Sequence, residues 1–219
     1  MRALFVAGAH TDVGKTYVGC VLLTAARTRG LRVAAFKPVV SGVDAADWVD
    51  SDPGRLLAAM GQPLTDETLQ GVSPLRFAAP LSPPMAARRE GADLRLGTLA
   101  DLCRQALARA QADLMLVEGA GGVMSPLAED GLNLDLMAAL GLPVLLVGGS
   151  YLGSMSHNLT ALEVVRARGL AVEALVVSQD ADPSAPDFAE TLADLRRFSS
   201  GTPVVGAARN AQAWTADLL

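Results

Sequence analysis

Nine residues near the amino terminus have the types and the spacing of a phosphate-binding loop. They run from Gly8 to Thr16, read GAHTDVGKT, and stand between an apolar run and a helical pattern. In such a loop, backbone N–H groups and the amino terminus of the helix surround phosphate oxygens, a lysine reaches the β- and γ-phosphates, and a hydroxyl binds Mg²⁺. Lys15 and Thr16 occupy these two positions. The first glycine comes one residue early, because Ala9 takes the expected place, but the strand–loop–helix context favours phosphate binding over an ordinary turn.

A second basic group comes at the end of the next apolar run. The chain has 18 Lys and Arg residues, of which only Lys15 and Lys37 are lysines. Lys37 follows the run RVAAF and precedes Pro38. An edge lysine that keeps its ammonium in water is the alternative. We favour a lysine that points into a functional site. A guanidinium replaces a compact ammonium poorly, and an ammonium here can stabilise charge on a transferring phosphoryl group.

Two acidic residues are candidates for the same site. Glu118 ends the apolar run DLMLV and precedes a glycine-rich segment at 119–122, whose backbone can approach a ligand closely. A carboxylate at the end of a buried strand is costly unless a metal or a lysine pairs with it, which favours a site. Asp52 lies just before a helical pattern. It is either a helix N-cap or a second acidic group on the metal, and the spacing leaves both open.

The histidines and cysteines give weaker indications. His10 and His157 are the two histidines, and their spacing is not that of metal ligands. For His157 an ordinary helix position is the preferred interpretation. Cys20 and Cys103 lie far apart, so we expect small buried apolar residues in a reducing compartment.

The apolar runs predict a parallel β-sheet. They are continuous, as in strands buried on both faces, and helical patterns alternate with them. Ligands bind such sheets beyond the carboxyl ends of the strands. The prediction is an α/β, P-loop NTPase-like domain over 1–219, with helices on both faces of the sheet. Strands are expected at 3–7, 32–39, 113–117, 143–147, 172–177 and 203–205, and helices at 15–29, 53–60, 98–111, 132–140, 154–168 and 187–198; the Pro- and Gly-rich stretch from about 41 to 97 is expected to carry only the short helix at 53–60.

The composition excludes several classes of protein. The chain has 219 residues, of which 51% are hydrophobic and 19% charged, a folded and not a disordered composition. The net charge of -5 does not favour nucleic acid as a partner. The apolar run at the amino terminus is too short for a signal peptide, and no run is long enough for a membrane span. We therefore expect a cytoplasmic protein with no membrane partner.

The motifs in combination resemble the dethiobiotin synthetase family along nearly the whole chain. The matching segments are GAHTDVGKT, FKPVVSG, SD before a helix, LVEGAGG, and LG..SH near a helix start, and the extra residue in the phosphate loop is typical of this family. The resemblance implies an ATP- and Mg²⁺-dependent ligase of biotin biosynthesis that acts on 7,8-diaminopelargonate and CO2. One amine becomes a carbamate, and a carbamate oxygen attacks the γ-phosphate. The second amine then closes the ureido ring, so that ADP and phosphate are released.

The resemblance also implies a role for each matching residue. Lys37, Lys15 and Thr11 are implied to be catalytic, and Ser41 to contact the substrate. The implied metal ligands are Thr16, Asp52 and Glu118. For Asp52 the resemblance therefore favours a metal ligand over a helix N-cap. The implied ATP-binding residues are Asp12, Val13, Gly14, Lys15, Thr16, Tyr17, Asp52, Glu118, Gly119, Ala120, Gly121, Gln179, Asp180 and Ala207.

One further segment bears on assembly. Gly153, Ser154 and Ser156 resemble the segment that binds the substrate carboxylate of the neighbouring subunit, and a helix amino terminus suits a carboxylate. This implies a homodimer with active sites at its interface.

Two segments depart from the family pattern. Gln179 stands where the family commonly has asparagine before Asp180, and its longer arm shifts the amide. The segment 206–208 lacks a proline often found in the last nucleotide loop. The resemblance therefore predicts phosphate chemistry and leaves the choice of nucleotide open.

Two rival functions have signatures that the chain does not match. Amidotransferase-type ligases of the same superfamily usually carry a glutaminase domain with a nucleophilic cysteine, and Cys103 lies in a helical pattern without that context. Switch ATPases of the partitioning kind have a signature lysine five residues before the loop lysine. His10 occupies that position here.

Overall fold

A six-stranded parallel sheet forms the centre of the computed structural model, which describes residues 1–43 and 47–219. The strand order is β10-β9-β8-β1-β5-β2, and every neighbouring pair is parallel. The carboxyl ends of β1, β5 and β8 therefore meet at one edge, where ligands bind such sheets. The strands of this sheet are β1 (Arg2–Gly8), β2 (Val33–Phe36), β5 (Leu114–Glu118), β8 (Val144–Gly149), β9 (Val172–Ser178) and β10 (Val204–Ala207).

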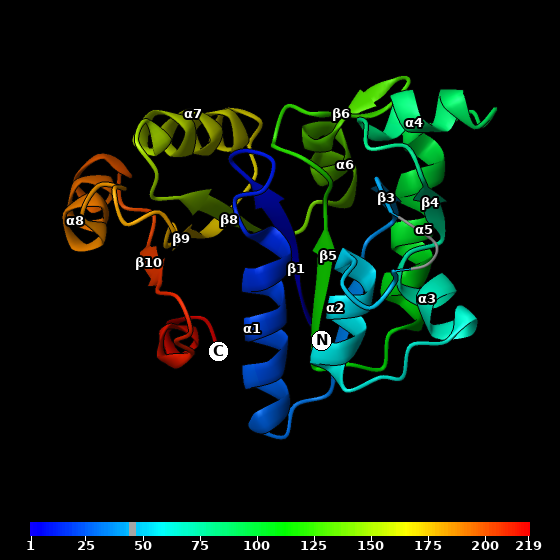
Figure 1. Cartoon of the computed structure of the whole chain (residues 1–219), viewed down its shortest axis with the longest axis horizontal. Helices are drawn as coiled ribbons and strands as arrows, with labels where there is room; N and C mark the ends of the chain where they lie inside the picture. Colours follow the sequence, from blue (N-terminus) through cyan, green and yellow to red (C-terminus); the bar gives the residue numbers. More distant parts are fainter. Residues whose placement is uncertain (44–46) are drawn as a thin grey trace.

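Helices cover both faces of the sheet, which confirms the predicted α/β class (Figure 1). Successive side chains of β1 enter two separate hydrophobic clusters. Leu4 and Val6 pack on the side of α1, whereas Phe5 and Ala7 pack on the opposite side. The first cluster is covered by α1 (Lys15–Thr28), α2 (Asp52–Met60), α3 (Asp66–Val72) and the 3₁₀ helix η1 (Ala213–Asp217), and the second by α4 (Pro83–Arg89), α5 (Leu96–Arg109), α6 (Asn133–Leu140), α7 (Ser154–Ala167) and α8 (Phe188–Phe198).

The expected strand at 32–39 is two strands in the structure. The central sheet keeps β2 only to Phe36, and β3 (Val39–Ser41) pairs instead with β4 (Leu75–Phe77) in a separate two-stranded sheet. Between them, the Lys37 N–H donates to the carbonyl oxygen of Val72. Pro38 has no N–H to donate, so a ladder cannot run through it. Lys37 thus stands at the break, beyond the end of the central strand.

The stretch from 41 to 97 holds more structure than the sequence predicted. Residues 44–46 of this stretch lie outside the described residues. The helix expected at 53–60 is α2, but α3, β4 and α4 were missed because each is short and its signals are turn residues. Thr65 and Thr68 form a capping box at α3, and a pair of prolines opens α4. A small hairpin of β6 (Pro126–Ala128) and β7 (Gly131–Leu132), together with η1, was also not predicted.

The two cysteines lie partly or fully inside the protein. Cys103 is fully buried and Cys20 partly so. Burial raises the pKa of each thiol to about 12, so both stay protonated near neutral pH. This accords with the apolar role expected for them.

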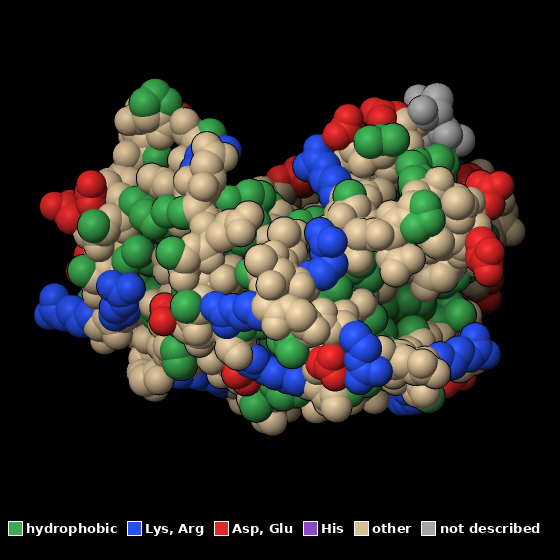
Figure 2. All heavy atoms as spheres, turned by 90° about the horizontal axis from the view of Figure 1, so that it is seen from below, with side chains coloured by type: hydrophobic (Ala, Val, Ile, Leu, Met, Phe, Trp, Pro, Cys, Tyr) green, Lys and Arg blue, Asp and Glu red, His purple; other side chains and the backbone are tan. Residues whose placement is uncertain are grey.

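The surface mixes charges of both signs. Figure 2 shows Lys and Arg side chains interspersed with Asp and Glu side chains on the face seen from below. Such mixing does not build an extended field of one sign on that face. Among the described residues, no helix combines the length and the apolar composition that crossing a bilayer requires.

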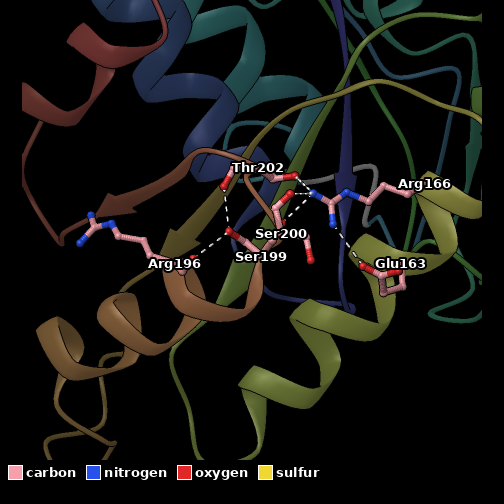
Figure 3. A network of polar contacts seen from close by, with 6 residues as sticks. All are labelled: Glu163, Arg166, Arg196, Ser199, Ser200 and Thr202. Carbon is pink, nitrogen blue, oxygen red and sulfur yellow. Dashed lines mark hydrogen bonds and ion pairs between the residues drawn. The ribbon is translucent and has the colours of Figure 1, made fainter.

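Arg166 of α7 ties this helix to the turn after α8 (Figure 3). Its guanidinium donates to the carbonyl oxygens of Ser199 and Ser200, at 2.6 and 3.1 Å, and to the hydroxyl of Thr202. The same guanidinium pairs with Glu163 at 3.1 Å. The last carbonyls of a helix have no partner within it, so Arg166 supplies the donors that the end of α8 lacks.

Replacing Arg166 by leucine is expected to lower the free energy of unfolding by about 2 kcal/mol, because the partly buried carbonyl oxygen of Ser199 and hydroxyl of Thr202 lose their donor. Urea unfolding followed by circular dichroism measures the change. Arg95→Leu is the matched control, since Arg95 pairs with Asp93 at an exposed position, and its effect should stay within about 0.5 kcal/mol. Equal unfolding midpoints for the two variants would contradict the capping role of Arg166.

Candidate active site

The loop from Gly8 to Thr16 connects β1 to α1 and has the backbone of an anion cradle. Asp12 and Gly14 adopt positive φ angles of 59° and 92°. Gly14 is the N-cap of α1, and among the described residues no side chain caps this helix. A Cβ at Gly14 would lie 3.0 Å from the Ser178 hydroxyl, so the turn needs glycine. The first N–H groups of α1 are therefore free to bind an anion.

Lys15 folds back over this loop. It is 7% exposed, and a Cβ on Gly8 would lie 3.1 Å from its Nζ. Burial and the nearby Lys37 lower the pKa of Lys15, while Glu118, Asp52 and Asp12 act in the opposite sense. A bound anion would favour the charged form, because it would replace the water that burial has removed.

Lys37 and Glu118 form a buried ion pair beside the loop. Their side chains are 3% and 2% exposed, and Lys37 Nζ lies 2.6 Å from Glu118 Oε1. The same ammonium lies 2.8 Å from Asp52 Oδ2. The Thr16 hydroxyl donates to Glu118 Oε1 at 2.7 Å. Residues from α1, α2, β5 and the break after β2 thus converge on one cluster of charges.

The ionisation of this cluster follows from its pairing. Burial alone would lower the pKa of Lys37, but Glu118 and then Asp52 outweigh it and hold that pKa above its usual value. Burial would raise the pKa of Asp52, but Lys37 and the Thr16 hydroxyl keep it below its usual value. Lys37 and Asp52 are therefore both charged near neutral pH. Glu118 Oε2 is buried and has no hydrogen-bond partner among the described residues, so it can still accept a ligand.

The structure decides between the two interpretations of Asp52. The N-cap of α2 is Ser51, whose Oγ accepts a hydrogen bond from the Gly54 N–H at 3.2 Å. Asp52 is the first residue of the helix, and its carboxylate points to Lys37. The N-cap interpretation of Asp52 is therefore wrong.

Two cavities meet at the phosphate loop, and both are lined by Thr11, Asp12, Gly14 and Tyr17. The first, which we call the β9 cavity, has a volume of about 400 Å³. The second, which we call the Lys37 cavity, has a volume of about 760 Å³. The β9 cavity is lined further by Val13, Tyr151, Ser178, Gln179, Asp180, Arg209 and Asn210, and the Lys37 cavity by Lys15, Thr16, Lys37, Ser41, Asp52 and Arg55.

Ser41, the residue predicted to contact the substrate, lies in the Lys37 cavity. Its hydroxyl donates to the carbonyl oxygen of Leu81 at 2.6 Å. The donor is therefore in use, and toward the cavity Ser41 offers oxygen lone pairs. Such an oxygen suits a ligand that carries N–H groups.

The glycine segment after β5 is held from behind by α6. The Asn133 amide donates to the carbonyl oxygens of Ala120 and Gly122, each at 3.2 Å. Ala120 and Gly121 line the Lys37 cavity. Gly119 does not, because it faces Asn133, and a Cβ there would lie 2.4 Å from the amide oxygen.

Some expected site residues lie outside both cavities of this chain. Gly153, Ser154 and Ser156 stand at the start of α7 and line neither cavity, and the buried Ser154 hydroxyl has no partner among the described residues. Ala207 does not line the β9 cavity but accepts a hydrogen bond from the Gln179 N–H at 3.0 Å.

The sequence missed several residues that line the cavities. Gln179 Oε1 accepts a hydrogen bond from the Arg209 N–H at 3.0 Å, so the loop after β10 positions this amide. Arg209 could have been found, because it follows the end of the last strand. The residues missed in the β9 cavity include Tyr151, Ser178, Arg209 and Asn210, and those missed in the Lys37 cavity include Arg55, Ser125 and the segment 80–83.

Known proteins resemble this chain along its whole length. Residues 2–215 match the family model of an AAA domain. The ATP-dependent dethiobiotin synthetase BioD of Phenylobacterium zucineum (strain HLK1) is 57% identical over 219 residues, which cover 100% of this chain and 94% of that protein. Proteins with the same description from Caulobacter vibrioides (strain NA1000 / CB15N) and Methylobacterium nodulans are 56% and 46% identical, over 95% of this chain and 93% and 94% of their own.

Solved structures share the fold at low identity. The MinC:MinD cell division protein complex of Aquifex aeolicus matches with a TM-score of 0.58 at 11% identity, over 98% of this chain and 85% of that one. The signal recognition particle receptor FtsY of Elizabethkingia anophelis matches with a TM-score of 0.56 at 17% identity, over 98% of this chain and 61% of that one. At these identities the likeness concerns the fold alone, so the full-length relatives carry the assignment.

Proposed function

The chain belongs to the ATP-dependent dethiobiotin synthetases, and from this premise we propose how its residues bind ATP, CO2 and 7,8-diaminopelargonate and form the ureido ring of dethiobiotin. One observation carries the proposal. The ammonium of Lys37 lies between two carboxylates, beside the phosphate loop and on the wall of a cavity large enough for a second substrate. An anionic phosphate and an anionic carbamate can meet there with cationic groups on both sides.

The nucleotide spans the loop and the β9 cavity. The phosphates lie on the backbone N–H groups at the start of α1, with Lys15 at the β- and γ-phosphates. Asp12, Val13, Gly14 and Tyr17 line the β9 cavity, which lies beyond the ends of β8, β9 and β10. The base enters this cavity, where Gln179 and Asp180 lie on the wall.

Thr16, Asp52 and Glu118 would hold Mg²⁺. A hydroxyl, two carboxylates and phosphate oxygens form the all-oxygen set that this ion prefers, and the unpartnered Oε2 of Glu118 is a free acceptor. Asp52 and Glu118 are both within 2.8 Å of Lys37, so with Mg²⁺ bound these carboxylates would interact with both the metal and the ammonium. When bound, Mg²⁺ neutralises charge on the β- and γ-phosphates.

The diamine occupies the Lys37 cavity. Ser41 presents oxygen lone pairs to a substrate N–H. Lys37 and Lys15 face the carbamate and the γ-phosphate from two sides, and Thr11 lines both cavities at their junction. These residues orient the carbamate oxygen in line with the phosphorus and stabilise negative charge as it moves to ADP. The carbamate oxygen takes up the γ-phosphoryl group, which gives a carbamic–phosphoric anhydride and ADP. The second amine then attacks the carbonyl carbon of this anhydride, loses a proton and expels phosphate as the ureido ring closes.

The substrate carboxylate is bound by a second copy of the chain. Gly153, Ser154 and Ser156 lie at the amino terminus of α7, away from the cavities of their own chain. The neighbouring side chains of Leu152 and Met155 are 86% and 40% exposed. An apolar rim around a helix amino terminus suits a homodimer interface that completes the partner's site. We place this homodimer in the cytoplasm.

The direct test is ring formation from labelled bicarbonate. With 7,8-diaminopelargonate, Mg²⁺, ATP and ¹⁴C-bicarbonate, we expect label in an acid-stable ureido carbon and one ADP released per ring. Omitting the diamine should stop both. Folded enzyme that hydrolyses ATP without acid-stable label would overturn the synthetase function, and ammonia- or glutamine-dependent ADP release would favour an amide-forming ligase instead.

A further inference from the structure

Three side chains connect the phosphate loop with the start of α7. The rings of His10 and His157 stack, with their centroids 5.7 Å apart and their planes 11° apart. The Tyr151 hydroxyl lies 2.7 Å from Nδ1 of His157. His10 belongs to the loop after β1, His157 to α7, and Tyr151 to the turn between β8 and α7. We call these three residues the histidine stack.

His10 is fixed from the loop side. Its Nδ1 lies 2.6 Å from the carbonyl oxygen of Thr11. A carbonyl oxygen can only accept, so Nδ1 carries the proton of this hydrogen bond. The orientation of the ring and the orientation of the Thr11 carbonyl are therefore coupled. Because Thr11 lines both cavities, a displaced His10 ring would displace a wall of each.

Tyr151 is fixed from the sheet side. It lines the β9 cavity and packs on Gly149, where a Cβ would lie 2.6 Å from Cε1 of its ring. Burial and the charge of Asp180 raise the pKa of Tyr151, so its hydroxyl stays protonated and can donate to His157. His157 thus contacts one residue on the phosphate loop and one on the wall of the β9 cavity.

We propose that His157 is a positioning residue, whose ring holds the tip of the phosphate loop and Tyr151 in the geometry that binds the nucleotide. The inference rests on the proposed placement of ATP across the loop and the β9 cavity. Its physical basis is that the backbone N–H groups of the loop must already point at the phosphate site when ATP binds, and a small displacement of them lowers kcat/KM. The side chain of His157 is exposed, so it contributes little to the core. The sequence favoured an ordinary helix position for His157, which would not account for its contacts with His10 and Tyr151.

The test compares three single substitutions on α7. His157→Ala removes both the ring that stacks on His10 and the hydrogen bond to Tyr151, whereas His157→Phe keeps a flat ring against His10. Thr160→Ala is the matched control, because Thr160 is exposed on the same helix and outside both cavities. For His157→Ala we expect kcat/KM for ATP to fall about tenfold, mainly through KM. His157→Phe should lose at most about twofold, and Thr160→Ala should match the wild type.

A double-mutant cycle with His10→Ala locates the effect in the stack. If the rings act through each other, His10→Ala with His157→Ala should lose about as much as the larger single loss. Full additivity, an unchanged KM in His157→Ala, or equal losses in the Ala and Phe variants would each overturn the proposal. Dethiobiotin formation by the wild type is measured in the same assay, so failure of the proposed function is recognised separately.

Discussion

Lys37→Ala is expected to lower kcat for dethiobiotin formation by about a thousandfold, while affinity for ATP changes by less than about threefold. Lys37 lines the cavity proposed for the diamine and not the β9 cavity. Its ammonium is buried and its pKa is held above the usual value by Glu118 and Asp52 against the effect of burial. A charge fixed there stabilises the phosphoryl group as it transfers, more than it binds ground-state ATP.

The Lys37 experiment needs a second variant, because removing the ammonium leaves Glu118 buried without a counter-charge. Breaking a buried ion pair in this way costs about 3–5 kcal/mol, which could unfold the chain. Lys37→Gln retains a donor for Glu118 and lacks the charge. The kcat of both variants should fall. As a control for folding, thermal unfolding is measured, together with calorimetric titration of a non-hydrolysable ATP analogue. A loss confined to the affinity for that analogue would contradict the catalytic role.

Glu118→Gln is expected to raise the Mg²⁺ concentration at half-maximal rate by about 10- to 100-fold. The amide keeps the shape of the side chain and a carbonyl oxygen for the Thr16 hydroxyl, but it loses the charge that a metal requires. The same change removes the group that most strongly opposes the effect of burial on the pKa of Lys37. That pKa should fall, and kcat should fall with it even at saturating Mg²⁺.

Glu129→Gln is the control for the loss of a carboxylate. Glu129 pairs with Arg88 at 2.6 Å, and Arg88 is more than half exposed. The Mg²⁺ requirement of the Glu129→Gln variant should equal that of the wild type, and chelation of Mg²⁺ by EDTA should stop both enzymes. If Glu118→Gln responds to Mg²⁺ as Glu129→Gln does, Glu118 is not a metal ligand.

The sequence predicted the architecture well where the signal is local and strong. Continuous apolar runs beside helical patterns gave the six strands of the central sheet, because strands buried on both faces leave no polar alternation. It did not predict α3, β4 and α4, since short elements have little periodicity and turn residues at their ends resemble irregular loops. It also joined β2 to β3, because an apolar run does not show where its hydrogen-bond partners change.

The site residues, too, were predicted where the local sequence carries a strong signal and missed where it does not. Lys37 and Glu118 were recognised as candidates because a charge at the end of an apolar run is costly without a partner, and Lys15 because it lies in the pattern of a phosphate-binding loop. Arg209 and Tyr151 were missed because their own neighbourhoods carry no such cost, although Arg209 follows the end of the last strand. His157 was given an ordinary position, since nothing within α7 shows that His10 lies against it.

The sequence by itself determined that this chain has a phosphate loop, two lysines and two carboxylates at strand or helix ends, and the motif order of the synthetase family. Only the tertiary structure decided that Lys37 lies between Asp52 and Glu118, and that Asp52 is no N-cap. The physical reason is distance along the chain. Motifs are properties of neighbouring residues, whereas Lys37 and Glu118 are 81 residues apart, and only the order of strands in the sheet brings them together.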